Sequence, residues 1–464
     1  MSAGDQDEDD FPATRLRRSA AIGRLAATEA AKFAATSAAN LGRPPNEAAD
    51  ALGRRQLETA QQMVRVLGGM KGVAMKLGQT LSVVDLSAIP EPYRDEVQHT
   101  LATLRDAAPA VRFSEMRRVL EQELGEPVGD VFAEFDEQPV AAASIGQVYR
   151  ACLHDGREVA VKVQYPGIAA AVRADLQNLG PLLRLAKQLV PGLDVTATVQ
   201  EVRERMSEEL DYELEASNQR AVARLHRGHP FVVIPEIVSE LCRERVIVMD
   251  FVHGRGHEQI ALLPQADRDR IAEMIFRFYF GSMYRHRAFS GDPHPGNSLL
   301  LDDGRLAFLD FGLFKRISAE AAERELRIQR LGVEGRGADL IEAMRSSGML
   351  PDPERAEPAA MLEQFRAYSW WFTTDEVVEL DPSLATAIVF DFSDPRAGRL
   401  QHIRHERLPA EHLFGRRLEM MTLAVMSQLR PRGNWFRIAR EWLYGDEPQT
   451  ELGALEAAYY ADRA

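Results

Sequence analysis

The spacing of apolar residues predicts that the chain is helical from about residue 12 to residue 124. Apolar side chains recur there at steps of three and four residues, the repeat that places them on one face of an α-helix. The clearest run comprises Met63, Val66, Leu67, Met70, Val73 and Leu77. A further helix is predicted to begin near "AAPAVRF", and "GEPVGDVF" is expected to end this helical region.

From residue 139 the pattern changes to that of β-strands. The segment "PVAAASIGQVYRACLHDGREVAVKVQYPG" has β-branched residues on both sides of Asp155-Gly156, a dipeptide typical of hairpin turns. A helical segment is predicted from about 168 to 227, followed by two strand-like runs, "FVVIPEIVSE" and "RVIVMDFV". After "HGRG" the pattern is almost entirely helical, except for short extended pieces at 298–301 and 305–310.

These patterns predict an α+β protein in four parts. Residues 1–12 form a polar tail that is expected to be disordered, and residues 13–127 form a helical N-terminal extension. Residues 128–252 form a small strand-rich lobe with a helical insert, and residues 253–464 form a large helical lobe.

Composition and charge restrict the class of protein. The chain of 464 residues, with 45% apolar and 27% charged residues, has the composition of a globular protein. A net charge of −14 argues against a nucleic-acid-binding protein, which needs a basic face. Two isolated cysteines favour a reducing compartment, no apolar run is long enough to span a membrane, and the acidic N-terminus is unlike a signal peptide. A cytoplasmic protein is expected.

One lysine stands inside the second strand of the predicted hairpin. Lys162 in "VAVKV" is flanked by valine and alanine, and a lysine on a half-buried strand is costly unless it pairs with an anion. The alternative is an edge-strand lysine that discourages aggregation. Upstream, "AAASIGQV" lies where a nucleotide-binding loop would lie, although with one glycine it is also compatible with an ordinary turn.

Three polar residues of the helical lobe have the spacing of a catalytic and metal-binding set. In "FSGDPHPGNSLLL" and "LAFLDFGLF", Asp292, Asn297 and Asp310 follow the order and nearly the spacing of protein kinases, whose D-x4-N loop precedes a D-F-G aspartate. A carboxamide and a carboxylate on adjacent short strands suit Mg²⁺, which shares its coordination with phosphate oxygens. D-F-G alone is also typical of a turn, but together with "VAVK" and D-x4-N it favours a nucleotide site. Asp292 is then the catalytic proton acceptor, and Asn297 and Asp310 are the metal ligands.

At these residues the chain resembles the UbiB/AarF family of atypical kinases, a group associated with coenzyme Q metabolism. The K-x-G-Q signature of the family is matched by Lys76-Leu77-Gly78-Gln79, and its E-x-D signature by Glu209-Leu210-Asp211. Its D-x-x-P-G-N-like loop is matched by "GDPHPGN". Its alanine-rich loop is matched by Ala141, Ala142, Ala143, Ser144, Gly146 and Gln147.

The resemblance implies a kinase-like bilobal fold with a helical extension over the active site, and it implies ATP or ADP with Mg²⁺ as cofactors. Lys162 is expected to contact the α and β phosphates and to pair with Glu215, or alternatively with Glu209. The alanine-rich loop, Glu215 and Met249 are expected to contribute to nucleotide binding. Regulatory roles are expected for Lys76, Gln79, Glu209 and Asp211.

Departures from the protein kinases bear on the substrate. Ser290-Gly291-Asp292 replaces H-R-D, and only "LFKRI" separates Gly312 from a new helix, "SAEAAEREL", which Ser318 is predicted to cap with Glu320 in its first turn. Little room remains for a peptide platform. Slow ATP hydrolysis, or phosphoryl transfer to a small and lipid-like molecule, is therefore expected rather than protein phosphorylation. A quinone-related molecule is one candidate.

The same residues are compatible with two other functions. The protein could instead be a pseudokinase switch, or a small-molecule-binding protein that nucleotide gates. The arginine-containing segment "TRLRRSAAIGRLAATEAAKFAAT" is compatible with peripheral contact to an anionic membrane, and equally with a helix packed on the core. Trp370-Trp371-Phe372 is compatible with a ligand platform, but aromatic residues of helical lobes more often form core. The pattern does not predict an oligomeric state.

Overall fold

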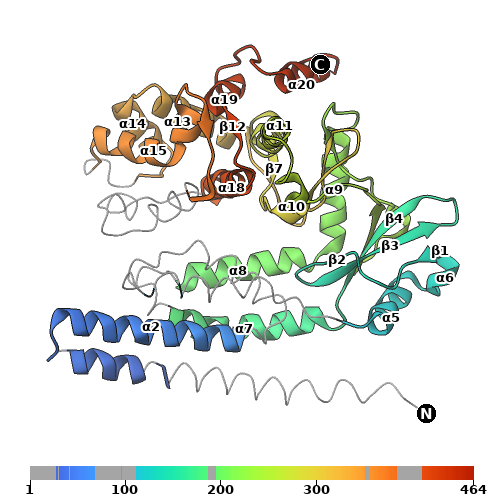
Figure 1. The fold of residues 1–464 in the computed structure, drawn as a ribbon, viewed down its shortest axis with the longest axis horizontal. Coiled ribbons are helices and arrows are strands. Elements are labelled where there is room, and N and C mark those ends of the chain that lie inside the picture. The colour runs from blue at the N-terminus through green and yellow to red at the C-terminus, as the bar shows by residue number, and fades with distance from the viewer. Residues whose placement is uncertain are drawn as a thin grey trace. The chain divides into compact units, whose positions relative to one another are not determined.

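The computed structural model describes residues 28–29, 31–40, 42–67, 93, 96, 111–186, 195–350, 356–383 and 410–463. Its residues form two compact units (Figure 1). The first unit contains the described residues up to Gly156, together with Val161–Asp211 and Arg243–Val246. The second unit contains Arg157–Ala160, Tyr212–Cys242 and the described residues from Ile247 onward. The predicted division into four parts stays a prediction.

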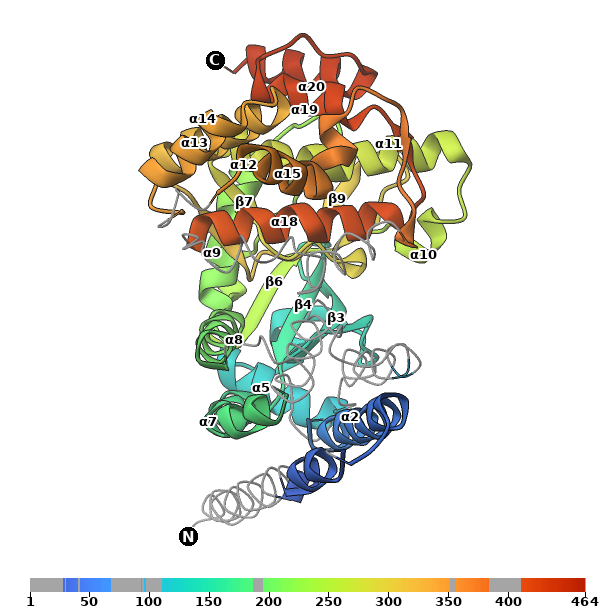
Figure 2. The same ribbon diagram turned by 90° about the vertical axis from the view of Figure 1, so that its left-hand side faces the viewer.

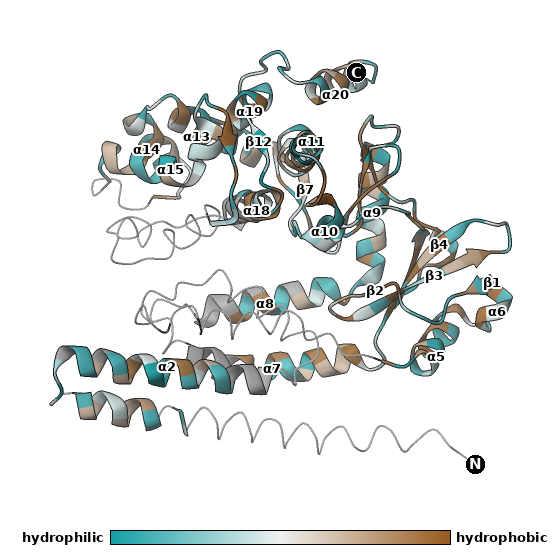
Figure 3. Ribbon diagram, in the orientation of Figure 1, coloured by the Kyte–Doolittle hydropathy of each residue, from teal (hydrophilic) through white to brown (hydrophobic). Residues whose placement is uncertain are grey.

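A five-stranded sheet contains the predicted hairpin. Its strands follow the order β1-β3-β4-β6, and β2 pairs with β3. Their bounds are β1 Phe132–Phe135, β2 Ala141–Ala142, β3 Gly146–Leu153, β4 Glu158–Gln164 and β6 Val246–Asp250. The predicted turn at Asp155-Gly156 is confirmed, because Gly156 has a φ of +88° and its N–H donates to the Leu153 carbonyl over 2.9 Å. In Figure 3, β3 and β4 are drawn mostly in the tan and brown of hydrophobic residues.

The helices of the first unit are those of the predicted extension and of the predicted insert. They are α2 Pro45–Leu67, α5 Phe113–Leu124, α6 Val128–Val131, α7 Ile168–Ala186 and α8 Val195–Glu209, in addition to a helical stretch at 31–40. Helices α7 and α8 pack against each other (Figure 1). The predicted helical segment 168–227 comprises α7, α8 and α9 (Tyr212–Leu225).

Three small sheets lie in the second unit. Strand β9 (Leu306–Phe308) pairs with β8 (Ser298–Leu300) and β5 (Val232–Val233), β7 (Ala288–Ser290) pairs with β10 (Phe314–Arg316), and β11 (Val378–Glu379) pairs with β12 (Arg432–Gly433). The extended pieces predicted at 298–301 and 305–310 are thereby confirmed as β8 and β9. The pairs β7–β10 and β11–β12 were not predicted, since strands of two or three residues are too short to show alternation.

Helices form most of the second unit, as predicted. They are α9, α10 His257–Ile260, α11 Gln265–Phe276, α12 Ser282–His286, α13 Ala319–Val333, α14 Gly337–Ser346, α15 Pro358–Thr373, α18 Ala410–Ser427, α19 Trp435–Leu443 and α20 Glu451–Ala461. Figure 1 shows α13, α14, α15 and α18 to the left of α11, and Figure 2 shows the same helices viewed from that side. Ser318 caps α13 as predicted, because its Oγ accepts from the Ala321 N–H over 3.0 Å. No helix among the described residues is long and apolar enough to cross a membrane.

The core of the second unit is aromatic. Trp371 and Phe372 are 1% and 2% exposed and pack with Phe276 and Phe280. This burial confirms that Trp371 and Phe372 belong to the core rather than to an exposed ligand platform. The same core reaches the strands next to the predicted site, where Phe278 stacks on Phe308 of β9 with ring centroids 3.7 Å apart.

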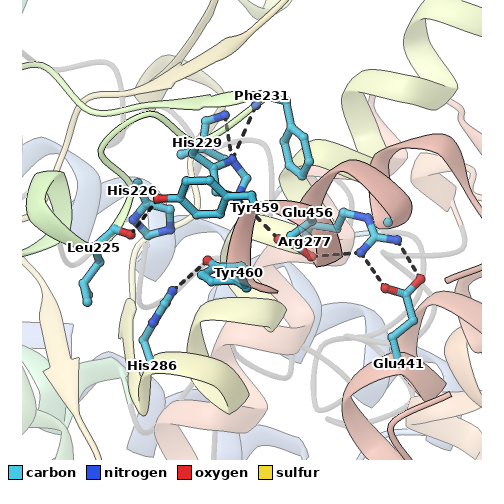
Figure 4. Close-up of polar contacts among 12 residues, drawn as sticks. Leu225, His226, His229, Phe231, Arg277, His286, Glu441, Glu456, Tyr459 and Tyr460 are labelled. Carbon is cyan, nitrogen blue, oxygen red and sulfur yellow. Dashed lines mark hydrogen bonds and ion pairs between the residues drawn. The ribbon is translucent and has the colours of Figure 1, made fainter. Parts of the chain in front are cut away.

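A buried charged cluster joins α20 to the core (Figure 4). Arg277 lies in a π-helical turn after α11, its side chain is fully buried, and it pairs with Glu273, Glu441 and Glu456 over 2.7, 2.7 and 3.0 Å. From the same helix as Glu456, the Tyr459 hydroxyl donates to the Leu225 carbonyl at the end of α9 over 3.2 Å. Helix α20 is therefore held to both α11 and α9.

Candidate active site

In the first unit, the alanine-rich segment is a tight hairpin turn. Ala142 lies opposite Gln147 in the β2–β3 pair, and the Ala143 N–H donates to the Gly146 carbonyl over 2.8 Å. Ala141 and Ala142 are exposed. The prediction of a turn between two strands is confirmed, and the contact of these residues with nucleotide stays a prediction.

Two polar side chains of this hairpin have protein partners within the first unit. Ser144 Oγ donates to Glu209 Oε2 over 2.9 Å, so the turn contacts the first residue of the E-x-D signature. Gln147 is buried, donates from Nε2 to the Val111 carbonyl over 3.3 Å, and accepts from the Tyr149 hydroxyl at Oε1 over 2.7 Å. These bonds favour an anchoring role for the Gln147 side chain in β3.

Lys162 lies on an interior strand. Its strand, β4, is positioned between β3 and β6, so the alternative of an edge-strand lysine is wrong. Lys162 is 9% exposed, and its neighbours Val161 and Val163 are fully buried. A buried ammonium group is tolerated only where an anion compensates it. Gln164 Nε2 donates to the Leu210 carbonyl over 2.9 Å, which joins the same strand to the E-x-D segment.

In the second unit, Asn297 and Asp310 lie at the same end of a hairpin. Ser298 lies opposite Phe308 in the antiparallel β8–β9 pair, and the Leu309 N–H donates to the Asn297 carbonyl over 3.0 Å. Asn297 precedes β8 directly and Asp310 follows β9 by two residues. The structure thus brings together the two residues predicted as metal ligands, which are thirteen positions apart in the sequence.

Asp292 lies beside this pair. It follows β7, and β7 pairs with β10, so the loop before Asn297 and the segment after Asp310 are held side by side. Asn297 Nδ2 donates to the Asp292 carbonyl over 3.2 Å. Burial, and then the nearby carboxylates of Asp292 and Asp310, raise the pKa of Tyr279 above its ordinary range. All three predicted residues therefore belong to one site within the second unit.

Helix α9 contributes Glu215 to the surroundings of Asp310. Glu215 is 3% exposed. Its Oε2 and Asp310 Oδ1 lie 3.7 and 3.5 Å from the point that a Cβ on Gly312 would occupy. Glu215 therefore lies beside the D-F-G turn, whereas Glu209 is bonded to Ser144. Which of the two glutamates pairs with Lys162 stays a prediction.

Met249 is packed inside the second unit. It is 6% exposed in β6, and its Sδ accepts from Gln219 Nε2 over 3.4 Å. Gln219 also donates to the Pro235 carbonyl over 2.8 Å. The predicted contact of Met249 with nucleotide stays a prediction.

Some predicted residues lie elsewhere. Lys76 and Gln79 lie outside the described residues, so their regulatory role stays a prediction. Asp211, between α8 and α9, is exposed.

The sequence did not indicate two histidines, His294 in the loop after Asp292 and His257, which lies near His294. His294, an exposed residue of the predicted loop, accepts from the Gly296 N–H at Nδ1 over 3.1 Å. Burial, and then the neighbouring His294, lower the pKa of His257 at the start of α10. His294 could have been found from the sequence, because it lies within "GDPHPGN" between Asp292 and Asn297. Nothing in the sequence linked His257 to this loop.

The donor set fits a magnesium ion that also binds phosphate. Asn297 donates from Nδ2 to the Asp292 carbonyl, so its Oδ1 is the atom suited to a hard cation, and Asp310 lies at the same end of the hairpin. Mg²⁺ takes one or two protein oxygens and completes its shell with phosphate and water. Among the described residues there is no group of three or more His, Cys, Asp or Glu side chains arranged for a metal.

The fold and the order of these residues along it are those of a protein-kinase-like protein. Residues 103–330 match the family model described as the ABC1 atypical kinase-like domain. The chain belongs to this family of atypical kinases, the UbiB/AarF group.

Individual relatives agree with this family. The chain is 33% identical over 277 residues to the rat protein named atypical kinase COQ8B, mitochondrial. The aligned region covers 60% of this chain and 52% of the relative. The chain is 33% identical over 327 residues to mouse AarF domain-containing protein kinase 1, covering 68% of this chain and 59% of the relative. The chain thus spans between half and two thirds of the length of these relatives.

A solved structure is similar over most of the chain. It is that of Rv3197 from Mycobacterium tuberculosis in complex with erythromycin, with 33% sequence identity and a TM-score of 0.60. The similarity covers 83% of this chain and 95% of the other.

Proposed function

We propose that the protein is an ATP-binding atypical kinase or ATPase that depends on Mg²⁺. The observation that carries this proposal is the arrangement of Asn297 and Asp310 at one end of the β8–β9 hairpin, with Asp292 beside them. Bound Mg²⁺ would neutralise charge on the phosphate groups. The buried Lys162 supplies a positive charge for the α and β phosphates.

Each residue then has a separate task. Asp310 and Asn297 provide hard oxygens for the cation. Asp292 accepts the proton of the attacking hydroxyl or water, or orients that group, as the catalytic-loop aspartate does in kinases. The His294 ring, with Nδ1 occupied by the Gly296 N–H, carries its proton on Nε2 when neutral, which makes it a donor at the edge of this loop.

The acceptor is a small or lipid-like molecule rather than a protein. Six residues, 313–318, separate Gly312 from α13, and three of them form β10, which is paired with β7. A protein kinase uses an ordered activation segment to bind its peptide substrate, and this short paired segment leaves none here. The association of the family with coenzyme Q makes a quinone-related acceptor the first candidate, reached by a cytoplasmic protein in peripheral contact with a membrane.

The test is phosphate release from ATP by the full chain, with and without anionic liposomes that contain an isoprenoid quinone. We expect Mg²⁺-dependent turnover that the liposomes increase and that Asp292→Asn abolishes. Turnover that persists in Asp292→Asn, or that is unaffected by chelation of Mg²⁺, would contradict the proposal. With ATP labelled at the γ-phosphate, label found on an added protein substrate, and not on lipid or in free phosphate, would contradict the assigned acceptor.

A second candidate is binding of a small apolar molecule under the control of nucleotide. The similarity to Rv3197, whose structure contains erythromycin, favours it. Thermal shifts with erythromycin and with an isoprenoid quinone, each with and without ATP and Mg²⁺, separate the candidates. A ligand shift that depends on nucleotide, in a protein without turnover, would support the binding function.

A further inference from the structure

The backbone of the D-F-G turn is held by hydrogen bonds from several elements. Ser290 Oγ of β7 donates to the Asp310 carbonyl over 3.4 Å, and the Gly291 N–H donates to the Leu313 carbonyl over 2.7 Å. Between these two points, the Phe311 carbonyl accepts from Asn218 Nδ2 of α9 over 3.1 Å. Asn218 and Phe311 are 93 residues apart in the chain.

The bond from Asn218 controls one particular peptide group. The Phe311 carbonyl and the Gly312 N–H belong to the same planar peptide unit, so they rotate together. On its other side, this unit donates from the Gly312 N–H to Asp310 Oδ1 over 3.0 Å. One peptide plane is therefore held by Asn218 at its oxygen and in turn holds the Asp310 carboxylate at its nitrogen.

Gly312, the residue that follows the Phe311 carbonyl, gives this peptide little restraint of its own. Gly312 has no Cβ, and glycine allows its flanking peptides a wider range of rotation than any other residue. The place of the missing Cβ is adjacent to the carboxylates of Asp310 and Glu215, at 3.5 and 3.7 Å. Both distances are ordinary van der Waals contacts, but glycine supplies no side chain to restrict the rotation, and the bond from α9 supplies a restraint instead.

We propose that Asn218 is a positioning residue that fixes the Phe311–Gly312 peptide and, through it, the orientation of the Asp310 carboxylate for the metal. This inference rests on the proposed function, and it adds a residue that the sequence motifs did not indicate. Glu215 lies three residues before Asn218 on the same face of α9. The helix therefore carries Glu215 directly and positions the Asp310 carboxylate through the Phe311–Gly312 peptide.

The test replaces Asn218 with leucine, which has a similar size and no donor. We expect the half-saturating Mg²⁺ concentration, measured by thermal shift at saturating ATP, to rise about 3- to 10-fold, the effect of one net hydrogen bond. Nucleotide affinity measured with EDTA should stay within about twofold of wild type. Amide hydrogen exchange in residues 309–314 of the nucleotide-free protein should become faster.

A matched control is Gln219→Leu on the same helix. Gln219 also donates to a backbone carbonyl, that of Pro235, over 2.8 Å, but not to the D-F-G turn. It should lower the melting temperature without changing the Mg²⁺ half-saturation. An equal rise in both variants, an unchanged value in Asn218→Leu, or a parallel loss of metal-free nucleotide affinity would overturn the proposal.

The two proposals fail in different ways. A wild-type protein with no Mg²⁺-dependent nucleotide binding would overturn the proposed function. The exchange measurement would then decide alone whether Asn218 holds the turn. Unchanged exchange in residues 309–314 would overturn that role whatever the activity.

Discussion

Asp310 and Asp292 carry the same side chain in two different settings. The Asp310 carboxylate is bonded to the Gly312 N–H next to Asn297, whereas Asp292 follows β7 and offers its carbonyl to the Asn297 amide. The first setting suits a metal ligand, because the turn fixes the Asp310 carboxylate, and the second places a proton acceptor beside the metal site.

The two aspartates should therefore respond differently to the same change. Asp310→Asn removes one anionic ligand, and we expect the half-saturating Mg²⁺ concentration for nucleotide binding to rise at least about 10-fold. Asp292→Asn should retain nucleotide binding and lose turnover by about 100- to 10,000-fold. Thermal shift and phosphate release measure both. Equal loss of binding in the two variants would argue against separate roles.

The alanine-rich turn offers a test of phosphate contact. Ala142 is exposed, and the Ala143 N–H is already bonded to the Gly146 carbonyl. Replacing Ala142 or Ala143 with glycine removes the Cβ that limits how closely the backbone approaches a phosphate. We expect a changed affinity for nucleotide and a changed preference between ADP and ATP, measured by titration calorimetry. Unchanged affinity for both nucleotides would show that the turn does not cover the phosphates.

Gly254 and Gly256 of "HGRG" offer a matched pair of substitutions that test how closely the backbone packs around Gly254. A Cβ on Gly254 would lie 2.9 Å from both Leu299 Cβ and the Leu300 carbonyl oxygen, whereas a Cβ on Gly256 would meet nothing within 4 Å. Gly254→Ala should lower the free energy of unfolding by about 1–3 kcal/mol in urea denaturation, because the backbone must move. Gly256→Ala should change it by less than about 1 kcal/mol. Similar values for the two variants would contradict the close approach.

At the scale of elements, α9 is held at its middle and at its C-terminal end within the second unit. Asn218 binds the D-F-G turn, and the carbonyls of Leu225 and Arg227 accept from the Tyr459 hydroxyl over 3.2 and 3.0 Å. Helix α20, which carries Tyr459, is anchored in turn by Glu456 on the buried Arg277 (Figure 4). The C-terminal helix thus supports the helix that carries Glu215.

Loss of this anchor should release α20. Glu456→Gln leaves the buried Arg277 charge without one of its three carboxylates, and we expect a loss of about 3 kcal/mol in the free energy of unfolding, near the lower end for a broken buried pair. Proteolysis within 451–463 should become faster. The control is Glu451→Gln. Glu451 also lies on α20 but pairs with Arg270 at an exposed site, so this change should lower the free energy of unfolding by only about 0–1 kcal/mol. Equal effects would contradict the anchoring role.

At the scale of the whole molecule, buried histidines should make the second unit sensitive to acid. Burial is the main cause that lowers the pKa of His226 from 6.5 to about 3 and that of His286 from 6.5 to about 4. Since the unfolded chain takes up these protons first, the histidines stabilise the folded protein at and above pH 6.5. That contribution is lost as the pH falls from 6.5 toward 3.

Glu456 acts in the same direction. Burial raises the pKa of Glu456, but its contacts with His229 and Arg277 outweigh burial and lower the pKa overall. Its contribution is therefore also lost on acidification, below about pH 4.5. We expect the melting temperature to fall between pH 7 and pH 4, and to fall less in His226→Asn. His154→Asn, an exposed histidine of the first unit, is the control and should follow wild type. Identical dependence of the melting temperature on pH in all three proteins would contradict a role for His226 in the acid sensitivity.

The sequence alone determined the features that depend on residues close together in the chain. The Asp155-Gly156 turn, the Ser318 cap and the extended pieces around Asn297 and Asp310 follow from local chemistry and were predicted. The order of Lys162, Asp292, Asn297 and Asp310 was enough for the kinase-like class. Only the tertiary structure showed that β4 is an interior strand, because strand order depends on which strands pair and periodicity does not record it. The bond from Asn218 to Phe311 and the three partners of Arg277 were likewise visible only there, since their donors and acceptors come from distant segments whose sequences carry no shared signal.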